Sequence, residues 1–550
     1  TFKPITEVEN ELASIKRQKD EIIKKIRTGD YSEKPKVVKV KDPRVIKAKA
    51  ELDALKRSFA MQMAAKSWDK MTFWQKAGAV WDAYRYQNML SGPQSQARNI
   101  YGNAFQLALV RPAEMSMEQL IDLGRGDFSD KARIPKYYVD LATSLPKSMS
   151  DAMNAFKEGA VDPKIMDIAK GGGDAAVQAA KIQGVPKVFT LVTRFMNAAD
   201  IFNRSMFETA RAAELERQGT TPEEAMAQAR LEGERILFRE KISDLAKDET
   251  RSVAERFLGQ VGTSIMGWRN WKIGGSVVSH AVPFVTTPVN IGAAQVAHSP
   301  LGFLVAPKNM TKAQAAKALS GTLVMGVGTA LAATGNTNWS NPKDEKQRTL
   351  GYAAERKPYS VKIGNTWVPM VFFGPYALAL AIPAAIKHYM TESKTALTDD
   401  FVTKATRAVA DTMGFITRQT SLQGASNFLE AMQGDPDKSL MGSLAFTATQ
   451  ALPLSGLQRY MNRILDPVYR KAPGFKEMIQ RDILLMSKYL EPYKDPDGKV
   501  SVRKWYNSAL PYEIGVVGEK AQKYEGAYQR EKTRLQKRAD ANAKKKRSRK

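Results

Sequence analysis

Hydrophobic residues near the start of the chain recur at alternating intervals of three and four positions. This spacing is typical of a coiled coil, in which successive apolar side chains line one side of a helix. Lys19 is the one break in the pattern, and Gly29-Asp30 ends the predicted helix. The positions that we expect to mediate helix pairing, and with it oligomerisation, are Val8, Leu12, Ile15, Ile22 and Ile26.

The same spacing returns between Val45 and Phe59, after a linker rich in Lys, Pro and Val. Residues 1–60 are therefore predicted to form a coiled-coil-like helical hairpin. Pairing with helices of a partner subunit would produce the same pattern. The spacing alone does not separate these two arrangements.

Helical patterns also dominate the rest of the chain. Residues 61–113 hold an aromatic helix and a Ser-Gly-Pro turn, residues 114–272 a helical domain, and residues 388–518 a C-terminal helical domain. Residues 519–550 read as a charged helix with a basic end. The pattern predicts an all-α, elongated assembly of many helices.

One segment has the period of two that is typical of strands. It runs from Tyr359 to Val368, and Gly364-Asn365 at its centre favours a tight turn. We therefore expect one small β-hairpin in an otherwise helical protein.

Three stretches between Lys272 and Lys387 contain no Asp, Glu, Lys or Arg: Ile273–Pro307, Ala318–Pro342 and Ile363–Ile386. Each is longer than the roughly 20 residues of helix that cross a bilayer. Their many Gly, Ala, Ser, Thr, Asn and Pro residues fit two structures, a buried core of small residues or a membrane or channel region over residues 273–387. The candidate membrane or channel positions are Val277, Val278, Phe284, Val324, Met325, Phe372, Phe373, Leu378 and Leu380.

Composition adds a strong positive charge to this picture. The 550 residues include 84 Lys and Arg against 57 Asp and Glu, which gives a formal net charge of +27. Such a chain is attracted to nucleic acid and to anionic lipid. There is no cysteine, which excludes disulfides and thiolate chemistry. The first residues show no signal-peptide pattern, and a start at Thr1 fits a trimmed or a proteolytically matured chain.

No residue pattern for catalysis or metal binding stands out. The three histidines are His280, His298 and His388, and the first two lie in the longest uncharged stretch with no carboxylate near them in sequence. We expect them to be buried or interfacial, and we predict a protein without enzyme activity, metal or cofactor.

The basic end of the chain is a candidate contact for nucleic acid or anionic lipid. Its cations match phosphates but carry no means of reading bases, so the predicted binding is nonspecific. A solvated terminus would show the same composition. The residues concerned are Lys544, Lys545, Lys546, Arg547, Arg549 and Lys550.

Two short motifs remain, the first from Leu90 to Asn103 and the second from Val282 to Asn290. Physically, the Ser-Gly-Pro of the first should end a helix, and the prolines of the second should interrupt the uncharged segment. Their notable residues are Leu90, Ser91, Gly92, Pro93, Asn99, Gly102 and Asn103, then Pro283, Phe284, Thr287, Pro288 and Asn290. With these residues, the two motifs resemble segments of the large internal virion proteins of short-tailed bacteriophages.

The resemblance implies a role in genome delivery. Proteins of this family are packed inside the virion near the portal, are ejected ahead of the DNA, and reassemble into a channel across the host periplasm and membrane. Their implied partners are further copies of the chain, other ejection proteins, the portal and tail, genomic DNA and the bacterial membrane.

Three other functions stay open at this point. A structural core protein retained around the portal would keep the uncharged segments buried. A cell-wall hydrolase would need a cleft with a buried glutamate, for example one between Glu208 and Glu240. A nonspecific DNA-binding protein would bind with a steep dependence on salt.

Overall fold

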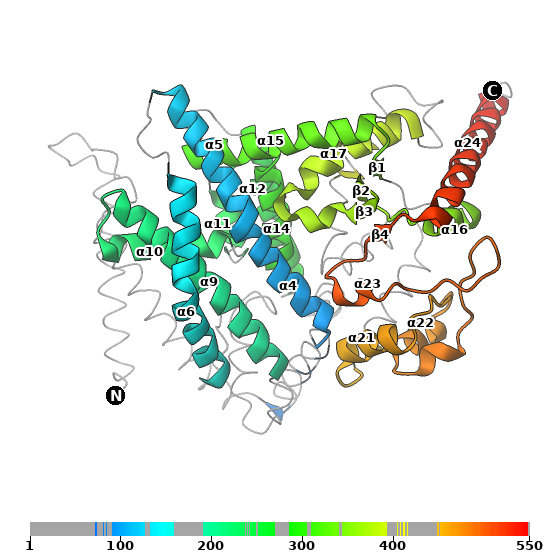
Figure 1. The fold of residues 1–550 in the computed structure, drawn as a ribbon, viewed down its shortest axis with the longest axis horizontal. Coiled ribbons are helices and arrows are strands. Elements are labelled where there is room, and N and C mark those ends of the chain that lie inside the picture. Colours follow the sequence, from blue (N-terminus) through cyan, green and yellow to red (C-terminus); the bar gives the residue numbers. More distant parts are fainter. Residues whose placement is uncertain are drawn as a thin grey trace.

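The computed structural model describes residues 91–126, 132–158, 191–236, 242–248, 251–269, 285–304, 310–339, 344–392 and 451–547, together with single positions between 72 and 88, at 238 and 240, and between 404 and 449. The described part is mostly helical, with one small antiparallel sheet (Figure 1). The predicted hairpin of residues 1–60, with its oligomerisation positions, lies outside the described residues.

Helices α4 to α14 and the short helices among them make up the first half of this structure. They are α4 (Pro93–Phe105), η1 (Gln106–Val110), α5 (Arg111–Gly124), α6 (Arg133–Glu158), α9 (Leu191–Arg217), α10 (Pro222–Ile236), α11 (Ile242–Lys247), α12 (Val253–Arg269), α14 (Thr286–Ala297) and η3 (Pro300–Phe303).

The second half contains the sheet as well as helices. Its helices are α15 (Lys312–Ala333), α16 (Glu345–Ala353), η5 (Met370–Tyr376), α17 (Ala377–Lys387), η6 (His388–Glu392), α21 (Ser455–Leu465), α22 (Phe475–Asp482), η7 (Met486–Tyr489), α23 (Tyr506–Ala509) and α24 (Glu519–Arg547). Its strands are β1 (Thr337–Asn338), β2 (Ser360–Ile363), β3 (Thr366–Pro369) and β4 (Gly515–Val516).

The sheet contains the predicted hairpin and two further strands. Strands β2 and β3 pair antiparallel around Gly364, whose φ of 56° suits the turn. Strand β1 adds to the β2 edge and β4 to the β3 edge, so that the order is β1-β2-β3-β4. The outer strands have two residues each, which is too short to show an alternating pattern in the sequence.

The Ser-Gly-Pro motif forms the predicted turn. The Ser91 hydroxyl donates a hydrogen bond to the Asn88 carbonyl (2.7 Å), and α4 begins directly afterwards at Pro93. A Cβ atom on Gly92 would lie 3.1 Å from the carbonyl oxygen of Gly456, so glycine also lets α21 approach closely.

Two groups of helices pack side by side (Figure 1). In one group, α9 packs against both α6 and α10. In the other, α15 packs against α17 and η3, and α12 packs against α14. Helix α5 joins the groups because it contacts both α6 and α15.

Candidate functional site: an apolar helix beside a buried charged cluster

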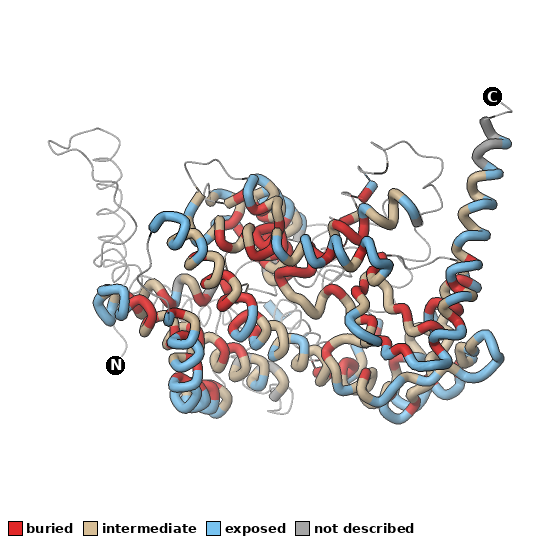
Figure 2. Tube along the Cα trace, turned by 45° about the horizontal axis from the view of Figure 1, so that its top comes forward, coloured by how far each residue is buried: buried red, intermediate tan, exposed pale blue. Residues whose placement is uncertain are grey.

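Helix α15 has an inverted pattern of burial. Its buried residues are small, and they include Ala316, Gly321 and Gly328. Two of its large residues, Leu323 and Val327, are instead 60% and 59% exposed, whereas Val324 and Leu331 pack partly buried against the core. Figure 2 shows exposed and buried positions alternating along this helix on the surface of the molecule. A helix of a soluble protein normally does the reverse, with large apolar side chains inward.

Glycines let α15 lie unusually close to its neighbours. A Cβ atom on Gly321 would stand 1.9 Å from the carbonyl oxygen of His298. One on Gly328 would stand 3.0 Å from Cγ of Pro383 in α17. Small residues at such contacts are how helices pack when backbones must approach closely.

The N-terminal end of α15 is firmly capped. Thr311 and Gln314 form a reciprocal capping box, in which each side chain accepts a hydrogen bond from the other residue's backbone N–H. Lys312 forms an ion pair with Asp122 at the end of α5. The helix is therefore fixed to α5 at its start.

Two described helices are long and apolar enough to cross a bilayer, Lys312–Ala333 and Met370–Thr391. They differ in burial, because 33% of the most apolar window is buried in the first and 61% in the second. The core helix of a soluble protein meets the same criteria of length and composition, and α17 within the second span matches that description. Leu378 is 0% and Leu380 3% exposed, so both of these predicted membrane or channel positions lie in the core.

The other predicted membrane or channel positions are spread over several environments. Val324 and Phe373 pack partly buried against the core around Trp339 and Val361. The Phe372 ring stacks edge-on against those of Tyr101 (5.3 Å) and Tyr512 (5.1 Å).

Met325 is half-buried on α15. Val277, Val278 and Phe284 lie outside the described residues.

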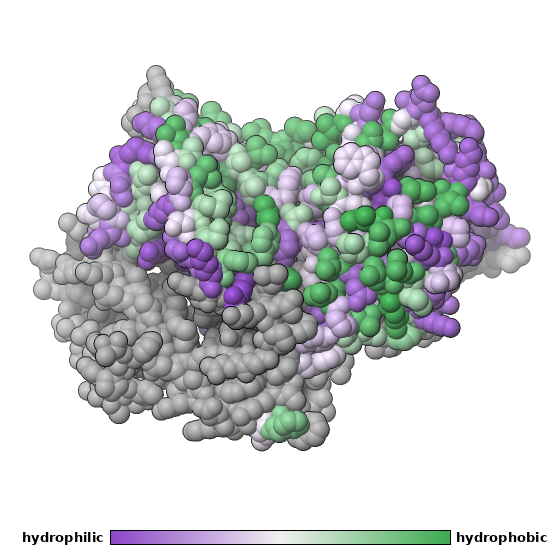
Figure 3. All heavy atoms as spheres, turned by 60° about the horizontal axis from the view of Figure 1, so that its bottom comes forward, coloured by the Kyte–Doolittle hydropathy of each residue, from purple (hydrophilic) through white to green (hydrophobic). Residues whose placement is uncertain are grey.

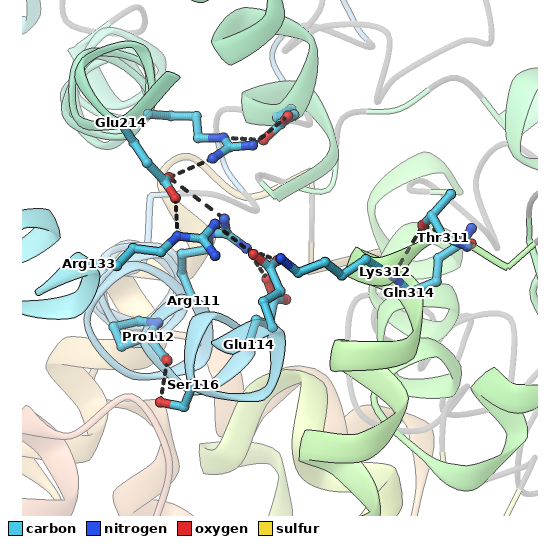
Figure 4. A network of polar contacts seen from close by, with 12 residues as sticks. Arg111, Pro112, Glu114, Ser116, Arg133, Glu214, Thr311, Lys312 and Gln314 are labelled. Atoms are coloured by element: carbon cyan, nitrogen blue, oxygen red, sulfur yellow. Dashed lines mark hydrogen bonds and ion pairs between the residues drawn. The ribbon is translucent and has the colours of Figure 1, made fainter. Parts of the chain in front are cut away.

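A buried cluster of arginines and glutamates lies beside α15, where α5, α6 and α9 meet (Figure 4). Arg111 Nη1 contacts Glu114 Oε2 (3.1 Å) and Glu118 Oε1 (3.0 Å). Arg133 from α6 bridges Glu118 (2.6 Å) and Glu214 of α9 (2.5 Å). All five side chains are less than 10% exposed. Each charge has a partner within hydrogen-bond distance, as burial of a charge requires.

The cluster extends to α10 through a second arginine of α9. Arg211 contacts Glu214 through Nη1 (2.6 Å) and Glu232 through Nε (2.7 Å). The two helix pairs α5/α6 and α9/α10 are thus held together by charge-assisted hydrogen bonds.

His298 connects this cluster to the apolar helices. Its Nε2 lies 2.8 Å from Glu114 Oε1 and its Nδ1 lies 2.7 Å from the carbonyl oxygen of Ala294. Both neighbours are acceptors, so the imidazolium form satisfies both contacts with donated hydrogen bonds. His298 is 2% exposed, and its ring meets that of Tyr376 edge-on. The contact between His298 and Glu114 could not be predicted from the sequence, because the two residues are 184 positions apart.

The charges of the cluster lower the pKa values of Glu114 and Glu214. Burial alone would raise the pKa of Glu114, but Lys317, His298 and Arg111 outweigh it and hold that pKa well below its ordinary value. In the same way, Arg211, Arg111 and Arg133 outweigh burial and lower the pKa of Glu214 to about 2. A general acid in a glycosidase needs the opposite shift, a raised pKa.

The pKa of Glu355 is raised, in contrast to the lowered pKa of Glu214. Burial raises the pKa of Glu355, with a smaller contribution from Glu513. Arg503 and Lys357 outweigh the effect of burial at Glu513 and lower the pKa of that carboxyl. Lys357 Nζ lies 3.9 Å from Glu355 and 4.0 Å from Glu513. For the hydrolase alternative, the raised pKa of Glu355 therefore suits a general acid better than the lowered pKa of Glu214 does.

The motif residues lie at junctions between helices. Asn99 donates to Asp200 Oδ1 of α9 (2.8 Å), and Asn103 donates to Asn99 Oδ1 (3.3 Å). Asn290 of α14 donates to the carbonyls of Phe238 (3.1 Å) and Glu240 (2.7 Å).

Three further motif positions are described. Thr287 and Pro288 form part of the first turn of α14, so the helix begins at this proline-containing segment. Gly102 lies within α4, and no atom lies within 4 Å of a Cβ built there. Leu90, Pro283 and Phe284 lie outside the described residues.

The predicted basic contact lies at the end of α24. Lys544, Lys545, Lys546 and Arg547 belong to the helix, and Lys545 is exposed. Arg549 and Lys550 lie outside the described residues.

A second exposed apolar surface, which sequence analysis did not predict, covers α21, α22 and the loop after them. Figure 3 shows apolar atoms gathered over this part of the molecule. The loop is held by Asn462, which donates to the carbonyls of Arg481 and Ile483 and accepts from the N–H of Leu485. Leu485 has a φ of 65°, a left-handed conformation that is costly for leucine. The surface comprises Ile464, Leu465, Phe475, Leu484, Leu485, Met486 and Tyr489.

Comparisons with protein-family models, with curated proteins and with solved structures find no match for this chain.

Proposed function

We propose that this is a virion protein of a short-tailed bacteriophage that is ejected into the host envelope and helps to form a channel for genome delivery. The inverted helix α15 carries the proposal. Small residues at the buried contacts, with large apolar residues such as Leu323 and Val327 exposed, suit a helix that packs on protein with one face and meets lipid with the other. The two family-like motifs and the net charge of +27 support the same role.

The proposed partners follow from the exposed surfaces. The surface over α21 and α22 exposes side chains such as Tyr489, which is 80% exposed, and large apolar patches mark contacts between proteins. We assign it to further copies of the chain or to other ejection, portal or tail proteins. The protein would reside inside the virion first and in the periplasm and inner membrane after ejection.

Flotation with liposomes tests the membrane role. Purified protein is mixed with neutral and with anionic vesicles that contain a dye, and both flotation and dye release are measured. We expect flotation and leakage with both kinds of vesicle. The double variant Leu323→Ser and Val327→Ser should lose both, because it removes the exposed apolar face of α15 without changing charge.

A matched control comes from α6. Val139 and Met149 are 60% and 56% exposed, close to the exposure of Leu323 and Val327, and are replaced by Ser in the same way. This control should float like the parent protein. Equal loss in both double variants would refute a specific role for α15. Absence of flotation in the parent would favour the core protein retained in the capsid, and flotation on anionic vesicles alone, abolished by salt, would leave only a basic surface.

A further inference from the structure

Most of the basic side chains described on helix α24 lie on one side of the helix. Successive residues of an α-helix are about 100° apart, so positions four, seven and eight residues onward share a face. By this geometry seven of the eight basic side chains described on α24 fall within an arc of about 100°, and Lys532 lies outside it. The seven within the arc are Lys520, Lys523, Arg530, Arg534, Lys537, Arg538 and Lys545.

The first half of α24 fixes the helix to the body of the protein. Tyr524 and Tyr528 are 4% and 2% exposed and pack with Leu350 of α16. Lys520 and Lys523 at this end contact Asp495 (2.8 Å) and Asp497 (3.5 Å), which balance their charge. The anchored half therefore adds little net charge to the basic face.

The second half projects from the body towards the C-terminus (Figure 1). Residues 530–547 include nine Lys or Arg and two acidic residues, Glu531 and Asp540. Glu531 is buried and contacts Arg534 (2.5 Å) and Lys346 (3.5 Å). The stretch from Arg530 to Lys545 is about 22 Å long at 1.5 Å per residue. A rigid row of cations of this length faces solvent.

We propose that this basic face of α24 binds the phosphate backbone of duplex DNA. This proposal rests on the proposed function, which identifies the DNA as the phage genome. It extends the predicted DNA contact from the last residues of the chain to the basic face of the whole helix. A rigid cationic helix matches a duplex that carries about one charge per 1.7 Å of its axis. An anionic bilayer suits it less well, because residues 536–547 contain no large apolar side chain to enter the headgroup layer.

Binding of a short fluorescent duplex of arbitrary sequence, followed by anisotropy over a range of salt concentrations, tests the proposal. Each phosphate-contacting cation contributes about one to the slope of log affinity against log salt. The variant Arg530→Gln, Arg534→Gln, Lys537→Gln and Arg538→Gln should therefore lower the slope by about four. Its affinity at about 50 mM salt should fall at least tenfold. Glutamine keeps the helix propensity high, so α24 should remain folded.

The control removes the same number of charges elsewhere. Four exposed lysines outside α24 are replaced by Gln: Lys476, Lys488, Lys499 and Lys504. This variant should keep most of the affinity and slope of the parent protein. Equal losses of DNA affinity in both variants would overturn the proposal in favour of diffuse electrostatic attraction. The proposal would also be overturned if the α24 variant lost binding to anionic vesicles while its DNA binding stayed unchanged. Flotation with neutral liposomes tests the proposed membrane role separately. A failure of the membrane proposal can therefore be told apart from a failure of the DNA-binding proposal.

Discussion

The close approach of α15 to His298 predicts opposite effects for the same substitution at two glycines of one helix. Gly321→Ala places a Cβ atom 1.9 Å from the His298 carbonyl oxygen, about 1.5 Å short of an ordinary contact at 3.4 Å. The neighbouring atoms are backbone, including Ser299 N at 2.7 Å, and they cannot rotate away. Gly326→Ala places its Cβ atom in open space, with no atom from the other described elements within 4 Å.

The magnitudes follow from two terms of opposite sign. Replacing Gly by Ala inside a helix stabilises by about 0.5 to 1 kcal/mol, and this term acts at both positions. Overpacking against fixed atoms costs about 1 to 3 kcal/mol or more, and this term acts only at Gly321. We expect Gly326→Ala to be slightly more stable than the parent and Gly321→Ala to be less stable by about 2 kcal/mol. Gly328→Ala should fall between them, since its contact with Pro383 Cγ is 3.0 Å.

Thermal unfolding of the parent and the three variants, monitored by circular dichroism under identical conditions, gives the order of stability. The expected order is Gly326→Ala, parent, Gly328→Ala and Gly321→Ala, from most to least stable. Equal midpoints for Gly321→Ala and Gly326→Ala would refute the packing of α15 on His298, and with it the inward orientation of the small residues.

Two further predictions concern the charged cluster and the apolar loop. The pKa of Glu214 is lowered from 4.5 to about 2, so its stabilisation is present above about pH 4.5 and is lost as the pH falls towards 2. It amounts to about 3 kcal/mol, and urea unfolding at several pH values should show a shallower acid dependence for Glu214→Gln than for the parent. In the loop, Asn462→Ala removes three hydrogen bonds to the backbone and should cost about 2 kcal/mol. Trypsin should then cleave faster after Arg481, whereas the exposed Asn542→Ala should leave the rate unchanged.

Local signals in the sequence predict local structure well. The turn at Gly364-Asn365 lies between two runs with strand character, and the hairpin forms there because both the turn and the strands are encoded within ten residues. The helical class follows likewise from periodicity, and α24 begins at the predicted Glu519. Strands β1 and β4 could not be predicted, because two-residue strands form only when a neighbouring edge is already present.

The charged cluster could not be predicted for a different reason. Arg133 and Glu214 are 81 positions apart, and each alone resembles an ordinary charge on a helix surface. Their pairing depends on how α6 packs against α9, which is a property of the tertiary structure. The uncharged run of α15 after Lys317 was visible in the sequence, but the orientation of the helix was not, because both of its faces are apolar.

The orientation of α15 also sets the order of events in any encounter with a membrane. Leu323 and Val327 are already exposed, so the outer face can enter a bilayer without unfolding. Burying two such side chains contributes roughly 3 to 6 kcal/mol, enough for reversible attachment but far from stable insertion. Spanning the bilayer would require α15 to leave α17 and to break the ion pair between Lys312 and Asp122. Surface attachment should therefore precede insertion, and insertion would also take Lys317 of α15 away from Glu114 in the cluster on α5, α6 and α9.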